Sequence, residues 1–109
     1  MFKNIVKAEP LIEVNAAGLG VAFTKVGSFD HACFMIRINN TSNQPYTISY
    51  DGVTDHDFIL ANQVIEIYTQ ANAAPPGKVA LFPKNMSFWL AGIAGVGDIY
   101  IVGYYQDTI

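Results

Sequence analysis

The sequence has little cysteine and little charge. Its single cysteine, Cys33, excludes a disulfide within the chain, so we do not expect a small secreted scaffold that is stapled by disulfides. Charged residues make up 14% of the 109 residues, whereas a soluble domain usually has about a quarter. Hydrophobic residues reach 51%. We therefore expect a partner to cover part of the surface.

The features of nucleic-acid-binding and membrane proteins are also missing. The chain has 6 Lys and Arg against 9 Asp and Glu, and its basic residues are scattered, whereas a phosphate-binding groove needs clustered cations. No apolar run approaches the roughly 18 residues of a transmembrane helix. The segment Met1–Lys7 is too polar and too short for the core of a signal peptide. We expect no nucleic acid, no membrane partner and no export by that route.

No segment of useful length has the periodicity of an amphipathic helix. Short runs of alternating residues are instead separated by Gly, Pro and Asn roughly every eight to twelve residues, which is typical of strands. In the clearest run, Phe34, Ile36 and Ile38 are predicted to face the core, and Cys33 and Arg37 to face away. Further strands are predicted at residues 21–26, 46–50, 58–60, 64–69, 79–82, 86–91 and 99–105, whereas residues 11–16 alternate only weakly.

This spacing predicts an all-β fold of about seven or eight short strands. We expect one antiparallel β-sandwich domain over residues 1–109, and the jelly roll is one form that it can take. A closed barrel is the alternative, because strand spacing does not report how the sheets close. Residues 1–10 are predicted to be an N-terminal arm or an edge strand, since Pro10 disfavours helix at Glu9.

A glycine-rich connection, residues 92–98, follows the strand predicted at 86–91. Its glycines, Gly92, Gly95 and Gly97, can adopt positive φ, so we interpret it as a tight turn between two aromatic strands. A dinucleotide-binding loop would have to lead into a helix, whose N-terminus holds the pyrophosphate. Gly97 leads into a predicted strand, and we reject that hypothesis.

The most polar segment, residues 51–57, contains three carboxylates and His56. Clustered oxygen ligands are what calcium requires, but the spacing is not that of an EF-hand and no Glu stands at the bidentate position. Asp and Asn are also common in turns, where they cap their own backbone. We favour a solvated loop without metal or cofactor, and Asp51, Asp55 and Asp57 remain the alternative, a calcium site.

His31 and Cys33 would share one face of a strand, as zinc ligands can. Only His56 and distant carboxylates could complete four ligands, so we interpret Cys33 as a buried or interface thiol. Neither a Gly-x-Ser-x-Gly elbow nor a cysteine beside a local base is present, and we predict that the protein is not an enzyme. The alternative, a small enzyme, needs both histidines and nearby carboxylates to converge in one cleft.

Four aromatic residues are candidate interface residues: Trp89, Tyr100, Tyr104 and Tyr105. Large rings with a polar tip pack in cores, cover protein contacts and stack on sugars. Packing within the domain is the simplest interpretation, and a protein interface is the next. The alternative function is a carbohydrate-binding module, in which these rings form a sugar platform and the loop at residues 51–57 holds calcium.

One pattern of turn and strand residues runs through residues 36–105. Its elements are Asn39-Asn40-Thr41, Pro45-Tyr46, Ser49-Tyr50-Asp51-Gly52, Asp55-His56, Leu81-Phe82-Pro83-Lys84, Phe88-Trp89, the glycines Gly92, Gly95 and Gly97, and Ile99-Tyr100-Ile101. In this pattern the chain resembles small virion proteins of tailed bacteriophages. In such proteins a β-sandwich module decorates the capsid or belongs to the neck or tail, usually in several symmetric copies.

The resemblance implies a non-enzymatic structural component of the virion, of the capsid-decoration or head-tail accessory type, that is assembled in the host cytoplasm. Its expected partners are other virion proteins and copies of itself, so we expect a homo-oligomer. Strand edges and exposed aromatic residues would make the contacts, and the N-terminal arm would extend onto a neighbour. Residues 1–29 carry no part of the resemblance.

Overall fold

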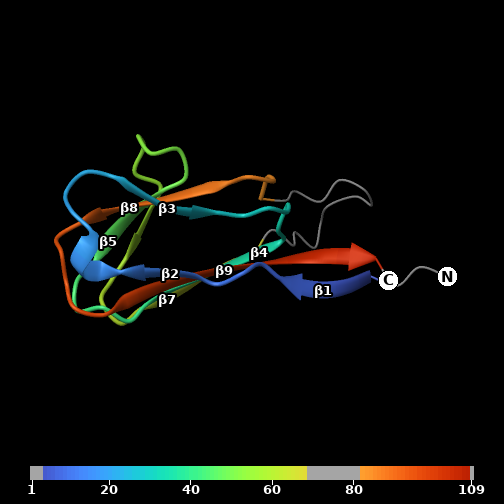
Figure 1. Ribbon diagram of the computed structural model, residues 1–109, viewed down its shortest axis with the longest axis horizontal. Coiled ribbons are helices and arrows are strands. Elements are labelled where there is room, and N and C mark those ends of the chain that lie inside the picture. The colour runs from blue at the N-terminus through green and yellow to red at the C-terminus, as the bar shows by residue number, and fades with distance from the viewer. Residues whose placement is uncertain (1–3, 69–81, 109) are drawn as a thin grey trace.

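The structure, a computed structural model, describes residues 4–68 and 82–108, which form a sandwich of two antiparallel sheets (Figure 1). Sheet A contains β1 (Asn4–Ala8), β2 (Ile12–Asn15), β4 (Met35–Asn40), β7 (Val64–Tyr68) and β9 (Asp98–Thr108). Sheet B contains β3 (Thr24–Ser28), β5 (Tyr46–Ser49), β6 (Asp57–Ile59) and β8 (Ser87–Gly92). A short 3-10 helix, η1 (Ala16–Gly18), follows β2. The predicted antiparallel sandwich is confirmed, and the jelly roll stays a prediction.

β9 is the central strand of sheet A. On one side it pairs with β4, which in turn pairs with β7; on the other side β1 and β2 pair with its two halves. Glu9 N–H donates to the Gly103 carbonyl at 2.8 Å, and Ile12 pairs with Ile101. Pro10 and Leu11 of the edge strand therefore lie opposite one residue of β9, Val102. This arrangement of two residues against one is a β-bulge. β1 and β2 are one edge strand, interrupted where proline has no N–H to donate.

Sheet B has the strand order β3-β8-β5-β6, and no described strand of one sheet pairs with a strand of the other. For the described residues, the closed barrel is therefore wrong. In the part of the chain that the structure describes, no helix is long and apolar enough to cross a membrane. Residues 4–8 of the predicted arm form β1, which pairs with β9 of the same chain.

The core lies between the sheets, and alternation along the strands places its side chains there. Ile36 and Ile38 of β4 are fully buried, as predicted, together with Phe88 and Leu90 of β8. Cys33 is also fully buried, which agrees with the interpretation as a buried thiol, whereas the outward position predicted from alternation is wrong. β4 begins only at Met35, and Cys33 makes an isolated bridge to Phe82, outside the alternation of the strand.

Two predicted strands differ from the observed ones. The strand predicted at residues 21–26 is shifted toward the C-terminus, because β3 spans Thr24–Ser28. The strand predicted at residues 79–82 lies outside the described residues except for Phe82. β8 and β9 do not form a hairpin, since they belong to different sheets. The connection between them therefore crosses from one sheet to the other.

The connection between β8 and β9 is hydrogen-bonded to the loop between β4 and β5. Asn43 Oδ1 accepts a hydrogen bond from Val96 N–H at 2.9 Å, and Thr41 Oγ1 donates to the Asp98 carbonyl at 2.7 Å. Among the three glycines of the connection, only Gly97 has a positive φ, of 116°. Gly92 and Gly95 are instead explained by neighbouring atoms that leave no room for a side chain. At Gly95, for example, a Cβ would lie 2.7 Å from Asn43 Oδ1.

Candidate functional site

The outer face of sheet A gathers aromatic and polar side chains from three strands. The register pairs each outward residue of β4 with one residue of β7 and one of β9, which gives rows across the sheet. The rows are Asn39 with Val64 and Tyr100, Arg37 with Glu66 and Val102, and Met35 with Tyr68 and Tyr104. Side chains that are neighbours across strands are about 5 Å apart, so these nine residues form one continuous surface.

A groove of about 390 Å³ lies on this surface. Its volume is at the lower end of the range for small-molecule sites, roughly 300–1,000 Å³. The lining combines apolar groups with hydrogen-bond donors and acceptors. It consists of Leu11, Arg37, Asn39, Val64, Glu66, Tyr100 and Val102. Such a lining suits either an inserted protein side chain or a sugar ring.

Neighbouring groups hold the polar side chains of this face in place. Arg37 Nη2 donates to Tyr104 Oη at 2.8 Å, and the guanidinium carbon lies 5.7 Å from the centre of the tyrosine ring. Tyr100 Oη donates to Asp98 Oδ2 at 3.4 Å. Burial raises the pKa of Tyr100, and the Asp98 carboxylate raises it further. The phenol therefore stays protonated and acts as a hydrogen-bond donor.

The four predicted interface residues do not share one surface. Tyr100 and Tyr104 lie on the outer face of sheet A, whereas Tyr105 points to the opposite side of β9 because successive side chains alternate. Trp89 belongs to β8 of sheet B, where its ring packs against Gly52; a Cβ at Gly52 would lie 2.9 Å from the ring. The structure thus brings together two of the four residues.

Asp51, a candidate calcium ligand, uses its carboxylate within its own loop. Oδ1 accepts hydrogen bonds from Val53 N–H and Thr54 N–H, both at 2.8 Å, and from Ser49 Oγ at 2.9 Å. These bonds, led by the one from Thr54, hold the pKa of the Asp51 carboxyl well below its usual range. Hydrogen bonds of this kind, from a loop's own backbone to an Asp side chain, are typical of a capped turn.

The other two candidate ligands are placed apart from this turn. Asp57 Oδ2 accepts a hydrogen bond from Tyr50 Oη at 2.6 Å, and Asp55 is exposed. Burial raises the pKa of Tyr50, and Asp57 raises it further. His56 Nδ1 accepts from Tyr50 N–H at 3.0 Å, which places the proton of the neutral ring on Nε2. Among the described residues, no three His, Cys, Asp or Glu side chains group closely enough to hold a metal ion.

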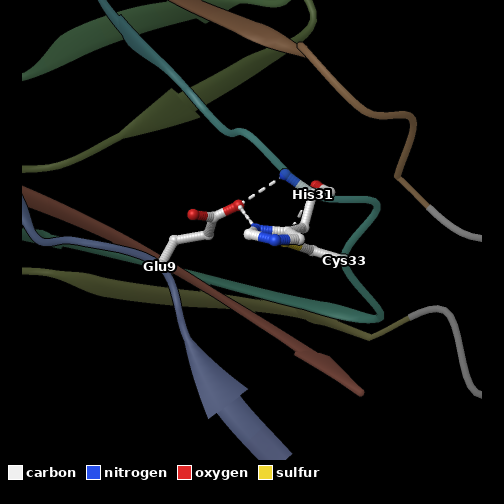
Figure 2. Close-up of polar contacts among 3 residues, drawn as sticks. All are labelled: Glu9, His31 and Cys33. Carbon is white, nitrogen blue, oxygen red and sulfur yellow. Dashed lines mark hydrogen bonds and ion pairs between the residues drawn. The ribbon is translucent and has the colours of Figure 1, made fainter. Parts of the chain in front are cut away.

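A second polar cluster joins the bulge after β1 to the loop before β4 (Figure 2). The side chain of Glu9 is only 2% exposed, and its Oε1 accepts from His31 N–H at 2.6 Å and faces His31 Nδ1 at 3.1 Å. The His31 ring stacks on Tyr105, with 3.9 Å between ring centres. Glu9 continues the register of β1 with β9 and lies opposite Gly103, on the inner side of sheet A, which is why this carboxylate is buried.

Cys33 lies beside this cluster, but its geometry is not that of an activated thiol. Its Sγ donates to the carbonyl oxygen of His31 at 3.4 Å rather than to the imidazole (Figure 2). Burial, together with the charge of Glu9, raises the pKa of the Cys33 thiol to about 11. The thiolate is the reactive form, and it is scarce at neutral pH. The other histidine, His56, is not part of this cluster, since its ring accepts a hydrogen bond from Tyr50 N–H in a different loop.

The first prediction concerns this thiol. We expect native Cys33 to react with iodoacetamide at pH 8 at least about tenfold more slowly than the unfolded chain, because the thiol is buried and protonated. Mass spectrometry of timed samples measures the rate. A Val53→Cys variant is the internal control, since Val53 is 82% exposed. Equal labelling of both positions in the native protein would contradict the prediction.

The second prediction concerns the buried carboxylate. Glu9→Gln is expected to lower the free energy of unfolding by about 1–2 kcal/mol, because a charge-assisted hydrogen bond to the His31 N–H becomes a neutral one. Urea unfolding measures the change. His31→Ala keeps that backbone bond and removes only the ring contacts, so its cost should be smaller. A larger loss for His31→Ala would place the stabilisation in the stacked rings instead.

Sequence reasoning missed several residues of these sites. Glu9 gave no signal beyond the proline that follows it, which marks an interruption of a strand. Arg37 and Glu66 are separated by 29 positions, and only the register of β4 and β7 makes them neighbours. Leu11 reaches the groove because the bulge turns it outward, where it is 57% exposed. Each of these placements depends on pairing between strands.

No protein family, no curated protein and no solved structure matches this chain. Function must therefore be argued from the surfaces and contacts described above, together with the motif pattern in residues 36–105.

Proposed function

We propose that this protein is a non-enzymatic structural component of a bacteriophage virion, of the capsid-decoration or head-tail accessory type, that acts through contacts with other virion proteins and copies of itself. The outer face of sheet A is the observation that carries the proposal. A solvated face of an antiparallel sheet normally carries polar residues. This face carries the polar side chains of Arg37, Asn39 and Glu66, but it also exposes apolar and aromatic ones.

The exposed fractions show how much apolar surface faces outward. Val64 is 50% exposed, Leu11 57% and Tyr68 59%, and Val6 of β1 on the same side is 63% exposed. Several apolar side chains exposed on one face are a feature of contact sites in soluble proteins. Tyrosine and arginine are the residue types enriched in protein interfaces, and Arg37, Tyr100 and Tyr104 lie on the same face. The composition therefore favours a protein partner.

The far end of β9 supports the same proposal. Beyond Tyr104, β9 pairs with β1 alone among the described strands, so the two form a ribbon that extends past the sandwich (Figure 1). A two-stranded ribbon is only marginally stable in water. Contact with a neighbouring subunit would stabilise it. This is the same N-terminal segment that we expect to reach a neighbour.

Particle purification tests the proposed function. The protein should co-purify with intact virions through a density gradient and remain with them after a high-salt wash. A Tyr104→Ala, Val64→Ser double variant should weaken its incorporation into virions. Val53→Ser, at an exposed position in the loop between β5 and β6, should not. Finding the protein only in the lysate of infected cells, with none in purified particles, would exclude the proposal.

The groove favours a second candidate, a carbohydrate-binding module. Arg37 and Asn39 supply donors, Glu66 supplies acceptors, and Tyr100 adds an aromatic ring to the lining, which is the mixture that a neutral sugar requires. A glycan array tests this function. Tyr100→Ala should then abolish binding while Trp89→Ala, on sheet B, leaves it intact. Absence of binding to every glycan on the array would remove this candidate.

A further inference from the structure

Among the described strands, sheets A and B have four outer edges, and three of them carry features that discourage further pairing. The β1–β2 edge is interrupted by the bulge at Pro10. The β3 edge has a register shift between Lys25 and Gly27. β6 has only 3 residues. Bulges, prolines and short strands are the usual devices that protect an edge.

β7 is the fourth edge, and it has none of these devices. Its five residues, Val64–Tyr68, keep one regular register with β4 and include neither proline nor glycine. In this respect β7 differs from the other edge strands that the structure describes. A regular, unprotected edge is a template for another strand.

The hydrogen-bond pattern shows which residues of β7 face the open side. Asn40 N–H donates to the Gln63 carbonyl at 2.9 Å, just before β7. In an antiparallel ladder the hydrogen-bonded pairs recur at every second residue, so Ile65 and Ile67 direct their backbone groups toward β4. Val64, Glu66 and Tyr68 therefore direct their N–H and C=O groups outward. No described residue bonds to these outward groups.

The side chains of these three outward residues define the partner. Val64 and Tyr68 are half exposed or more, and they flank the carboxylate of Glu66 on the outer face of sheet A. Arg37 lies directly across from Glu66, yet its guanidinium bonds to Tyr104, and no ion pair joins Arg37 to Glu66. Glu66 Oε2 accepts a hydrogen bond from the neutral Tyr68 hydroxyl at 3.3 Å, so the described residues leave the carboxylate without a cationic partner. An added strand would meet an apolar residue, an anion and an aromatic ring, in that order.

We propose that the β7 edge binds an extended segment of a partner protein, with Lys or Arg opposite Glu66 and apolar residues two positions to either side. Aromatic and β-branched residues paired across strands stabilise a sheet, as do opposite charges. A second copy of β7 fits less well, because a two-fold axis at Glu66 sets two carboxylates opposite each other. This inference rests on the proposed function and names the chemistry of one contact.

Two synthetic peptides test the proposal on the full chain. The first is Thr-Val-Thr-Lys-Thr-Tyr-Thr, and the second has Glu in place of Lys. Calorimetry should show at least tenfold tighter binding of the Lys peptide. Amide hydrogen exchange should slow at least tenfold at Val64, Glu66 and Tyr68 on binding, with Ile65 and Ile67 unchanged because β4 already holds them. This alternation is a signature that binding elsewhere on the face would not produce.

A proline variant separates the edge from the rest of the face. Glu66→Pro removes an outward N–H and leaves the bonds to β4 in place, so it should fold and lose peptide binding. Ile67→Pro is the contrasting variant, which should unfold β7. If Glu66→Pro does not fold, Glu66→Lys serves instead and should reverse the preference between the two peptides.

Three results would overturn the proposal: no slowing of exchange at the outward amides, equal binding by Glu66→Pro, or a dimer that Glu66→Pro converts to a monomer, which would make a second copy the occupant. The proposed function fails separately. A chain that is absent from virions but binds the Lys peptide overturns only the function, and a chain found in virions that ignores both peptides overturns only the edge site.

Discussion

Gly97→Ala is expected to lower the free energy of unfolding by about 4 kcal/mol, which corresponds to a fall in Tm of roughly 15 °C or more. Two causes add. The φ of Gly97 is 116°, a conformation that residues with a Cβ rarely adopt. A Cβ would also lie 2.8 Å from Ser42 Cα and 2.9 Å from the Thr41 carbonyl oxygen. Both neighbours are backbone atoms, which cannot turn aside as a flexible side chain would.

A matched control exists at another loop glycine. Gly20 has no positive φ, and a Cβ built there would meet nothing within 4 Å. Gly20→Ala should therefore change the free energy of unfolding by no more than about 0.5 kcal/mol. Thermal unfolding followed by circular dichroism measures both variants. A Gly97→Ala protein as stable as the Gly20→Ala protein would show that the two loops separate at little cost.

Alternation along the strand was enough to predict the core face of β4. Ile36 and Ile38 are fully buried because residues two apart share a face of a strand, and Phe34, which precedes β4, is partly buried. The same pattern does not say which strands are neighbours. The prediction of successive strands at 86–91 and 99–105 was correct, but their placement in different sheets depends on contacts with β4 and β5. A hairpin and a crossover look alike in a short glycine-rich sequence.

The candidate site was harder to predict for the same reason. Tyr100 and Tyr104 lie two residues apart on one strand, so their shared face follows from the sequence. Arg37 and Glu66 join them only through the register of β4 with its two neighbours. The burial of Glu9 depends on the pairing of β1 with β9 and on a partner 22 residues away, His31. Local patterns carry none of this information, since it arises from pairing at long range.

Asn40 carries the buried polar network of the loop between β4 and β5, and Asn40→Asp is expected to cost about 3–5 kcal/mol at pH 7. The Asn40 side chain is fully buried, and its Nδ2 donates to the carbonyl oxygens of Gln44 at 2.8 Å and Leu60 at 3.1 Å. Its Oδ1 accepts from both the N–H and the hydroxyl of Ser42. A carboxylate would turn an oxygen toward two carbonyl oxygens, and repulsion would replace two hydrogen bonds.

The pH dependence of this variant follows from the same contacts. Burial and the two facing carbonyl oxygens raise the folded-state pKa of the new carboxyl above its ordinary value of about 3.9. Below the ordinary pKa the carboxyl is protonated in both states, and folding is not penalised by a buried charge. The free energy of unfolding then falls as the pH rises through the raised folded-state pKa. The deficit of Asn40→Asp against the unmodified chain should therefore be smaller at pH 4 than at pH 7. Urea unfolding at both values measures it.

Asn39→Asp is the matched control for this prediction. Asn39 is the adjacent residue of β4, but its side chain lies on the outer face of sheet A and is partly exposed. The same chemical change there should alter the free energy of unfolding by about 0.5 kcal/mol or less, with little dependence on pH. Equal costs at the two positions would mean that the Asn40 network opens to water in solution. The loop between β4 and β5 would then be held by its backbone hydrogen bonds to the residues beside Gly97, from Thr41 N–H to the Asp98 carbonyl and from Asn43 N–H to the Val96 carbonyl, rather than by the buried Asn40 network.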